Sequence, residues 1–234
     1  TGRDQLERAG VQRAKYLVAV LDEDELNAEV ASQALHLVQD RQGQPLSCYI
    51  HMVDSNLREF LQSKELGHVD HESFSLNSIN VYMTAGREVL SRYPPFDTAA
   101  ATPPDTHILV IGVGRMGESL ITHMVKMWFD TYHAMSPKKI RITMIDADDT
   151  KEAYLRFRNP ITPYCDLTAY TMDIRSTEFL TRDFLRVADK ESAITAAYIC
   201  IGDDKMGVAT ALTLRRGGAV GAPTIPYAVP IIVR

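Results

Sequence analysis

The sequence predicts an α/β protein built on doubly wound parallel sheets, with one partial and one nearly complete unit. Short apolar runs alternate with segments of helical periodicity along the chain, as expected for strands joined by crossover helices. One of these runs, residues 108–111, leads directly into three glycines at G-x-G-x-x-G spacing and then into a helical segment. Strand, glycine turn and helix in this order are typical of a Rossmann-like nucleotide-binding unit.

Each glycine of this turn has its own expected role. Gly112 permits the tight turn, Gly114 lets the backbone approach a pyrophosphate, and Gly117 lets the helix pack closely on the strand. The start of the helix offers free N–H groups and a partial positive charge to phosphates. We therefore expect a mononucleotide or dinucleotide here; the alternative is a structural turn in a domain that has lost its ligand.

A carboxylate follows the next strand. Residues 140–145 form an apolar run that ends at Asp146, where a ribose hydroxyl pair would be held. Asp146 lies 29 residues beyond Gly117, whereas the usual interval is about 20, so the helix or its exit loop must be lengthened. Asp148 and Asp149 follow and no arginine comes directly after the strand, which favours NAD or an adenosine nucleotide over NADP. The alternative is a solvated acidic turn.

An internal repeat indicates two units. Residues 4–37 and 177–214 share one plan: short helix, apolar strand, acidic cluster, helix. We assign residues 1–97 to the later part of a first unit, 98–105 to a linker of small residues and prolines, and 106–234 to a second unit. Because residues 1–66 supply only the later strands of such a sheet, we expect the chain to be part of a longer protein.

Two further segments have predicted structures. The continuous apolar run at residues 16–21 is typical of a strand covered on both faces. Residues 78–92 have the spacing of a helix, which Pro94 and Pro95 would end.

Composition narrows the choice of partners and compartment. The 234 residues include 25 basic and 30 acidic side chains, a net charge of −5 that gives no basic field for nucleic acid. No apolar run reaches the length of a membrane span, and no signal peptide is evident. The cysteines, Cys48, Cys165 and Cys200, are odd in number and lie in or beside apolar stretches. They predict buried free thiols in the cytoplasm.

Imidazoles and carboxylates crowd residues 68–72, but no third ligand group follows at a recognisable spacing, so no metal is expected.

Several of these segments together resemble one family. They are the turn 112–117, Asp146, the stretch Asp173-Ile174-Arg175, the acidic runs Asp203-Asp204 and 22–27, and residues 56–61. The chain is similar to the regulator-of-potassium-conductance family, whose nucleotide-binding domain is also called the KTN or TrkA-N domain. The resemblance covers most of the chain, and the tandem arrangement carries most of its weight.

The resemblance implies a regulatory domain that binds NAD(H) or ATP/ADP, forms homo-oligomers and acts on a potassium channel or transporter at the cytosolic face of a membrane. By position, Gly112, Gly114, Arg115 and Gly117 would hold phosphates, Asp146 the ribose, and Asp173 with Arg175 the adenine side. The full set of predicted cofactor-binding residues is Gly112, Val113, Gly114, Arg115, Met116, Gly117, Asp146, Asp173, Arg175 and Asp203.

Two other classes stay open. An NAD-dependent oxidoreductase would need a proton-transfer group, but no tyrosine has a lysine four positions later and no G-x-S-x-G motif is present. No catalytic residue is therefore assigned, and we expect a protein that is not an enzyme. The third class is an interaction scaffold with a vestigial nucleotide pocket, which would fold and ignore nucleotides.

Overall fold

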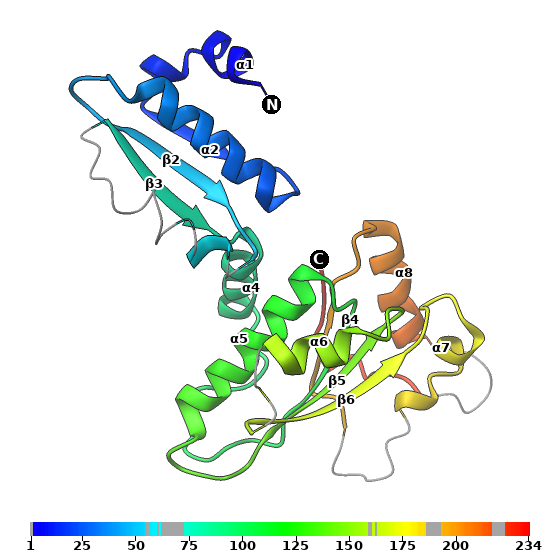
Figure 1. The fold of residues 1–234 in the computed structure, drawn as a ribbon. Helices are drawn as coiled ribbons and strands as arrows, with labels where there is room; N and C mark the ends of the chain where they lie inside the picture. The colour runs from blue at the N-terminus through cyan, green and yellow to red at the C-terminus, as the bar shows by residue number, and fades with distance from the viewer. Residues whose placement is uncertain are drawn as a thin grey trace. The chain divides into compact units, whose positions relative to one another are not determined.

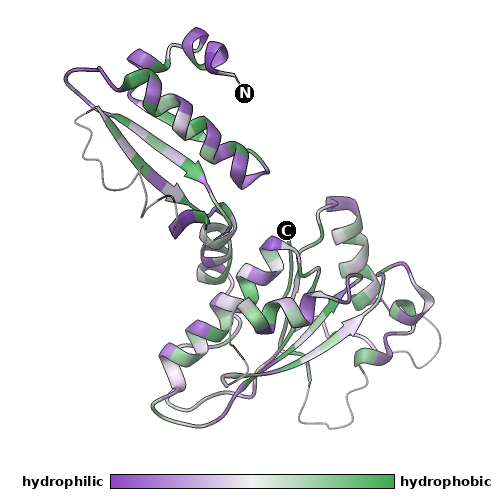
Figure 2. Ribbon diagram, in the orientation of Figure 1, coloured by the Kyte–Doolittle hydropathy of each residue, from purple (hydrophilic) through white to green (hydrophobic). Residues whose placement is uncertain are grey.

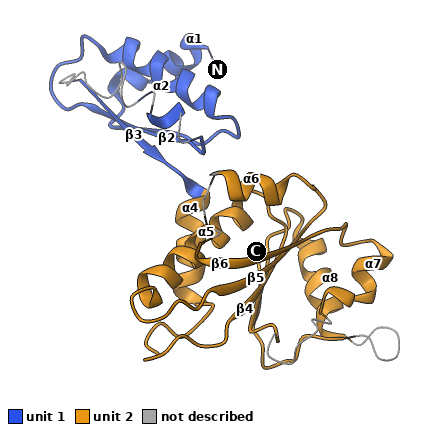
Figure 3. Ribbon diagram, turned by 60° about the horizontal axis from the view of Figure 1, so that its bottom comes forward, with its two compact units in different colours: residues 1–81 blue, residues 82–234 orange. Residues whose placement is uncertain are grey.

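The computed structural model describes residues 2–54, 57–59, 61, 73–158, 161, 163–185, 193–216 and 223–234. The chain forms two compact units, residues 1–81 and 82–234 (Figure 3). The proline-bearing segment 98–105, expected as a linker, thus falls within the second unit. Helix α4 (Val81–Arg92) begins at the last residue of the first unit.

The first unit is a three-stranded parallel sheet with helices on one face. Its strands, in the order β1-β2-β3, are β1 (Tyr16–Ala19), β2 (Leu46–His51) and β3 (Phe74–Ile79). The described residues of this unit also include α1 (Arg3–Arg8), a 3₁₀ turn (Val11–Arg13), α2 (Asp24–Val38) and the helical residues 57–59 and 61. Leu46, Cys48 and Ile50 of β2 share a buried cluster with Val30 and Ala34 of α2.

One prediction for this unit is wrong, and the start of one predicted helix is shifted. Tyr16 and Val18 in β1 are 57% and 58% exposed, so this strand is covered on one face only. Its apolar run is therefore no sign of burial on both sides. The helix predicted over residues 78–92 is present as α4, but it begins at Val81 because Ser78 and Ile79 pair with β2 as the end of β3. The alternation in residues 74–79 is too short to outweigh the helical spacing that follows it.

The second unit is a five-stranded parallel sheet in the order β6-β5-β4-β7-β8. Its strands are β4 (His107–Ile111), β5 (Ile140–Asp146), β6 (Cys165–Thr171), β7 (Ala196–Ile199) and β8 (Ile231–Val233). The chain first adds β5 and β6 on one side of β4 and then crosses to add β7 and β8 on the other. The edge beside β4 is therefore a topological switch point, where open α/β sheets bind ligands.

Helices cover both faces of this sheet (Figure 1). The elements are α4, α5 (Arg115–Tyr132) and α6 (Lys151–Arg158) on one face, and α7 (Thr177–Thr181), a 3₁₀ turn (Asp183–Leu185) and α8 (Asp204–Arg215) on the other. Within β4, Ile108 belongs to the cluster on the α5 side, and Leu109 to the cluster that holds Phe179 of α7. Figure 2 shows hydrophobic residues in green along β4 and β5, in the interior of this sheet. The doubly wound α/β fold is confirmed.

The internal repeat is also present in the structure. The order helix, 3₁₀ turn, strand, helix describes both α1 to α2 and α7 to α8. The first unit thus has the plan of the later part of the second, as expected for one partial and one nearly complete Rossmann-like unit. Among the described residues, no helix combines the length and apolarity needed to cross a membrane.

Candidate nucleotide-binding cleft

A cleft of about 590 Å³ lies at the carboxyl ends of four strands in the second unit. Each strand contributes its first residues beyond the sheet, so the cleft spans both sides of the switch point. The lining residues are Gly112 and Gly114 after β4, Ile145, Asp146 and Ala147 at the end of β5, Met172, Asp173, Ile174 and Arg175 after β6, Cys200, Ile201, Gly202 and Asp203 after β7, and Met206 of α8.

The three glycines of the turn have different environments. Gly112 has φ of +84°, and a Cβ atom there would lie 2.9 Å from the carbonyl oxygen of Cys200. A Cβ on Gly117 would lie 2.1 Å from the carbonyl oxygen of Gly112. Gly114 has φ of −72°, and a Cβ there would meet no atom within 4 Å. The fold itself therefore requires glycine at positions 112 and 117 but not at 114.

Gly114 is the N-cap residue of α5 and provides no side-chain cap. Neighbouring helices differ: the Ser176 side chain accepts a hydrogen bond from the N–H of Phe179 in α7, and the Asp203 side chain accepts one from the N–H of Met206 in α8. The first turn of a helix leaves N–H groups without intrahelical partners. At α5 the N-cap side chain supplies no such acceptor, and a helix start beside the cleft favours an anion.

Asp146 holds the glycine turn from the neighbouring strand. Its Oδ2 atom accepts a hydrogen bond of 2.5 Å from the N–H of Val113, and its Oδ1 atom accepts one of 2.9 Å from the N–H of Asp148. The long interval to Asp146 is explained by α5, which has 18 residues. Despite this length, β5 pairs with β4 in parallel and delivers the carboxylate to the cleft.

An ion pair lies on the β6 side of the cleft. Arg175 donates from Nε and Nη2 to the two carboxylate oxygens of Asp173, at 3.0 and 2.7 Å. These hydrogen bonds, with one from the backbone N–H of Arg175, lower the pKa of Asp173 from 3.8 to about 2. Both side chains are solvent-accessible, so the pair forms an exposed, charged part of the cleft lining.

The β7 side was missed by the sequence analysis except for Asp203. Cys200, Ile201 and Gly202 complete the wall there, and a Cβ on Gly202 would meet no atom within 4 Å. Burial raises the pKa of the Cys200 thiol to about 12, so this cysteine is a small apolar lining residue. The signal in the sequence was the apolar run that ends at residue 201, because every parallel strand of a sheet delivers its carboxyl end to the same edge.

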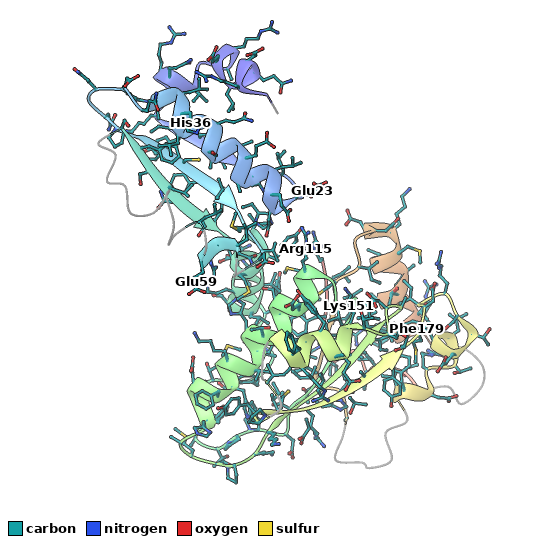
Figure 4. The ribbon with its side chains drawn as sticks, in the orientation of Figure 1. Glu23, His36, Glu59, Arg115, Lys151 and Phe179 are labelled. Atoms are coloured by element: carbon teal, nitrogen blue, oxygen red, sulfur yellow. The ribbon has the colours of Figure 1, made fainter. Side chains whose placement is uncertain are left out.

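Of the ten predicted cofactor-binding residues, six line this cleft: Gly112, Gly114, Asp146, Asp173, Arg175 and Asp203. Val113, Met116 and Gly117 are buried behind the turn, where they pack α5 against the sheet. Arg115 is exposed at the first turn of α5 (Figure 4). Its guanidinium group lies over the ring of Tyr82, at 5.7 Å from the ring centroid.

Other expectations have mixed outcomes. Cys48, Cys165 and Cys200 are free and buried, as predicted. In the part of the chain that the structure describes, no group of three or more metal-binding side chains is present. The His/Asp-rich segment 68–72 lies outside the described residues.

Comparison with models of known protein families and with curated proteins finds no match to this chain.

Proposed function

We propose that the second unit binds a nucleotide, NAD(H) or ATP/ADP, in this cleft and that the protein is a regulatory module that senses it. The observation that carries the proposal is Gly114. Space around this residue would admit a side chain without a clash, and its backbone conformation would suit one. Close approach of a ligand phosphate to the backbone supplies a reason for glycine that the fold does not.

The ligand would lie across the strand ends. Its phosphates would contact the turn at Gly112 and Gly114 and the start of α5, with Arg115 as the nearby cation. Asp146 would accept from the ribose hydroxyls, since a carboxylate has about four lone-pair sites and uses two for Val113 and Asp148. Asp173 and Arg175 would flank the adenine side. A 2′-phosphate would be repelled by this acidic edge, so NADP is disfavoured.

We further propose, on the resemblance to the regulator-of-potassium-conductance family, that the module works in the cytoplasm as a homo-oligomer. Its output would be a potassium channel or transporter. Binding would shift the balance between two arrangements of units or subunits, because a ligand favours the arrangement to which it binds more tightly. The net charge of −5 supports a partner other than nucleic acid.

Thermal unfolding with NAD, NADH, NADPH, ATP and ADP tests the proposal. The fluorescence of Trp128, the single tryptophan, reports on the second unit because this residue is buried in its core. At about 100 times its dissociation constant a ligand stabilises the fold by roughly 2.7 kcal/mol, a shift of about 5–10 °C.

Gly114→Asp should abolish that shift by placing a carboxylate against the phosphates, and it should not unfold the chain. Gly2→Asp is the matched control, since Gly2 is also an open N-cap glycine but lies in the first unit and outside the cleft. A shift that survives Gly114→Asp would refute the proposed site. No shift with any nucleotide would favour the scaffold, and turnover of a substrate with NAD would favour the oxidoreductase.

A further inference from the structure

One face of α5 is bound to the start of α4. Arg115, Ser119 and His123 are spaced four residues apart, so they lie along the same side of the helix. The Ser119 hydroxyl donates to the carbonyl oxygen of Tyr82 at 2.8 Å, and His123 Nε2 lies 3.0 Å from the carbonyl oxygen of Met83. The guanidinium group of Arg115 lies over the Tyr82 ring.

The two helices are in close contact at this point. Gly86 of α4 is buried, and a Cβ there would come within 2.5 Å of the Ser119 hydroxyl oxygen and 3.5 Å of the His123 ring. Interiors packed this closely transmit displacements instead of absorbing them. A shift of the first turn of α5 would therefore reach α4.

The start of α4 is also where the chain passes from one unit to the other. Val81 belongs to the first unit, and its N–H donates to Nδ1 of His51 at the end of β2. The next two residues, Tyr82 and Met83, belong to the second unit and are bonded to α5. Three consecutive residues of α4 thus include one that is hydrogen-bonded within the first unit and two that are hydrogen-bonded within the second.

We propose that Arg115 and Tyr82 form a ligand-sensitive contact that couples the nucleotide cleft to α4. This inference rests on the proposed function. Arg115 is the residue directly after Gly114, and a bound phosphate would draw its guanidinium group away from the ring. A charge-assisted hydrogen bond to phosphate is stronger than a cation–π contact with a partly buried tyrosine ring. The loss of that contact would loosen the first turn of α4, which leads into the first unit.

Calorimetric titration of the full chain with NADH and with ATP tests the coupling. Tyr82→Leu keeps an apolar side chain but removes the ring that competes for Arg115, so affinity should rise about two- to five-fold. The matched control, Tyr82→Phe, keeps the aromatic face and should bind as the wild type does. In an Arg115→Gln background, Tyr82→Leu should no longer change affinity. Circular dichroism of each variant checks that the fold is retained.

Hydrogen exchange gives an independent readout. Saturation with nucleotide should speed exchange of the α4 amides in the wild type and leave it unchanged in Arg115→Gln. Equal affinities of Tyr82→Leu and Tyr82→Phe, or α4 exchange that ignores the ligand, would overturn the coupling while leaving the nucleotide site in place. Failure of the wild type to bind either nucleotide would instead refute the proposed function, and the coupling with it.

Discussion

Replacing Gly117 by alanine tests whether the fold requires glycine where α5 packs against the turn. The new Cβ would lie 2.1 Å from the carbonyl oxygen of Gly112, whereas real Cβ atoms essentially never come within 3.0 Å of another heavy atom. Helix α5 would have to withdraw from the turn by roughly 1 Å in a close-packed interior. Such overpacking costs about 1–3 kcal/mol, and alanine regains up to about 1 kcal/mol of helix propensity. We expect a net loss of about 1–2 kcal/mol, at the upper end if the turn cannot yield.

The assay is denaturant unfolding followed by the fluorescence of Trp128, which lies in α5 itself and is 2% exposed. The signal therefore follows the second unit alone. Gly114→Ser is the matched control, because this position has room for a side chain and serine is a better N-cap than glycine by a few tenths of a kcal/mol. If both variants keep the wild-type midpoint, or if Gly114→Ser is the more damaging, the packing described for the turn is wrong.

Three further outcomes follow from the contacts of the cleft and core. Asp146→Asn should destabilise the second unit by about 1–2 kcal/mol in the same unfolding assay, because an amide offers one acceptor where the carboxylate serves two backbone N–H groups. The folded-state pKa of Asp173 is about 2, below its ordinary value of 3.8. Its ion pair with Arg175 therefore stabilises the folded state at pH values above 3.8, and this stabilisation is lost as the pH falls from 3.8 towards 2. Carboxyl NMR should show this low pKa, and Arg175→Ala should return it towards 3.8. Thiol reagents at neutral pH should label the folded chain slowly and the unfolded chain fully, because burial raises the pKa of all three cysteines: Cys48 to about 12, Cys165 to about 11 and Cys200 to about 12.

The fold was largely predictable because the apolar runs, the glycine turn and the helical periodicity all indicated alternating strands and helices. Four buried residues before the glycine turn, and Asp146 after the next run, marked the strands whose pairing defines the second unit. The predictions failed where a pattern depends on what packs against it. An apolar run such as residues 16–19 looks the same whether one or both faces are covered, and only the structure shows Tyr16 and Val18 exposed.

The cleft was only half predictable, for a related reason. Motif spacing identified the side of β4 that faces β5 and β6, because glycines and acids there stand at recognisable intervals. The opposite wall is made by Cys200, Ile201 and Gly202, which carry no motif and join the cleft through the crossover from β6 to β7. The position of Arg115 over Tyr82 was equally hidden, since the two residues are 33 apart in sequence and meet through helix packing.

The G-x-G-x-x-G spacing cannot by itself separate a nucleotide site from an empty turn, and the structure explains why. The fold requires two of its three glycines: Gly112 has a positive φ and lies beside Cys200, and Gly117 packs against Gly112. Any strand-to-helix turn of this shape would need them, with or without a ligand. Only Gly114 could carry a side chain without a clash or an unfavourable φ, so the fold does not require glycine at this position. A scaffold with a vestigial pocket would accept a side chain at position 114, whereas a bound phosphate would exclude one. Substitutions of Gly114 therefore distinguish a nucleotide site from an empty turn.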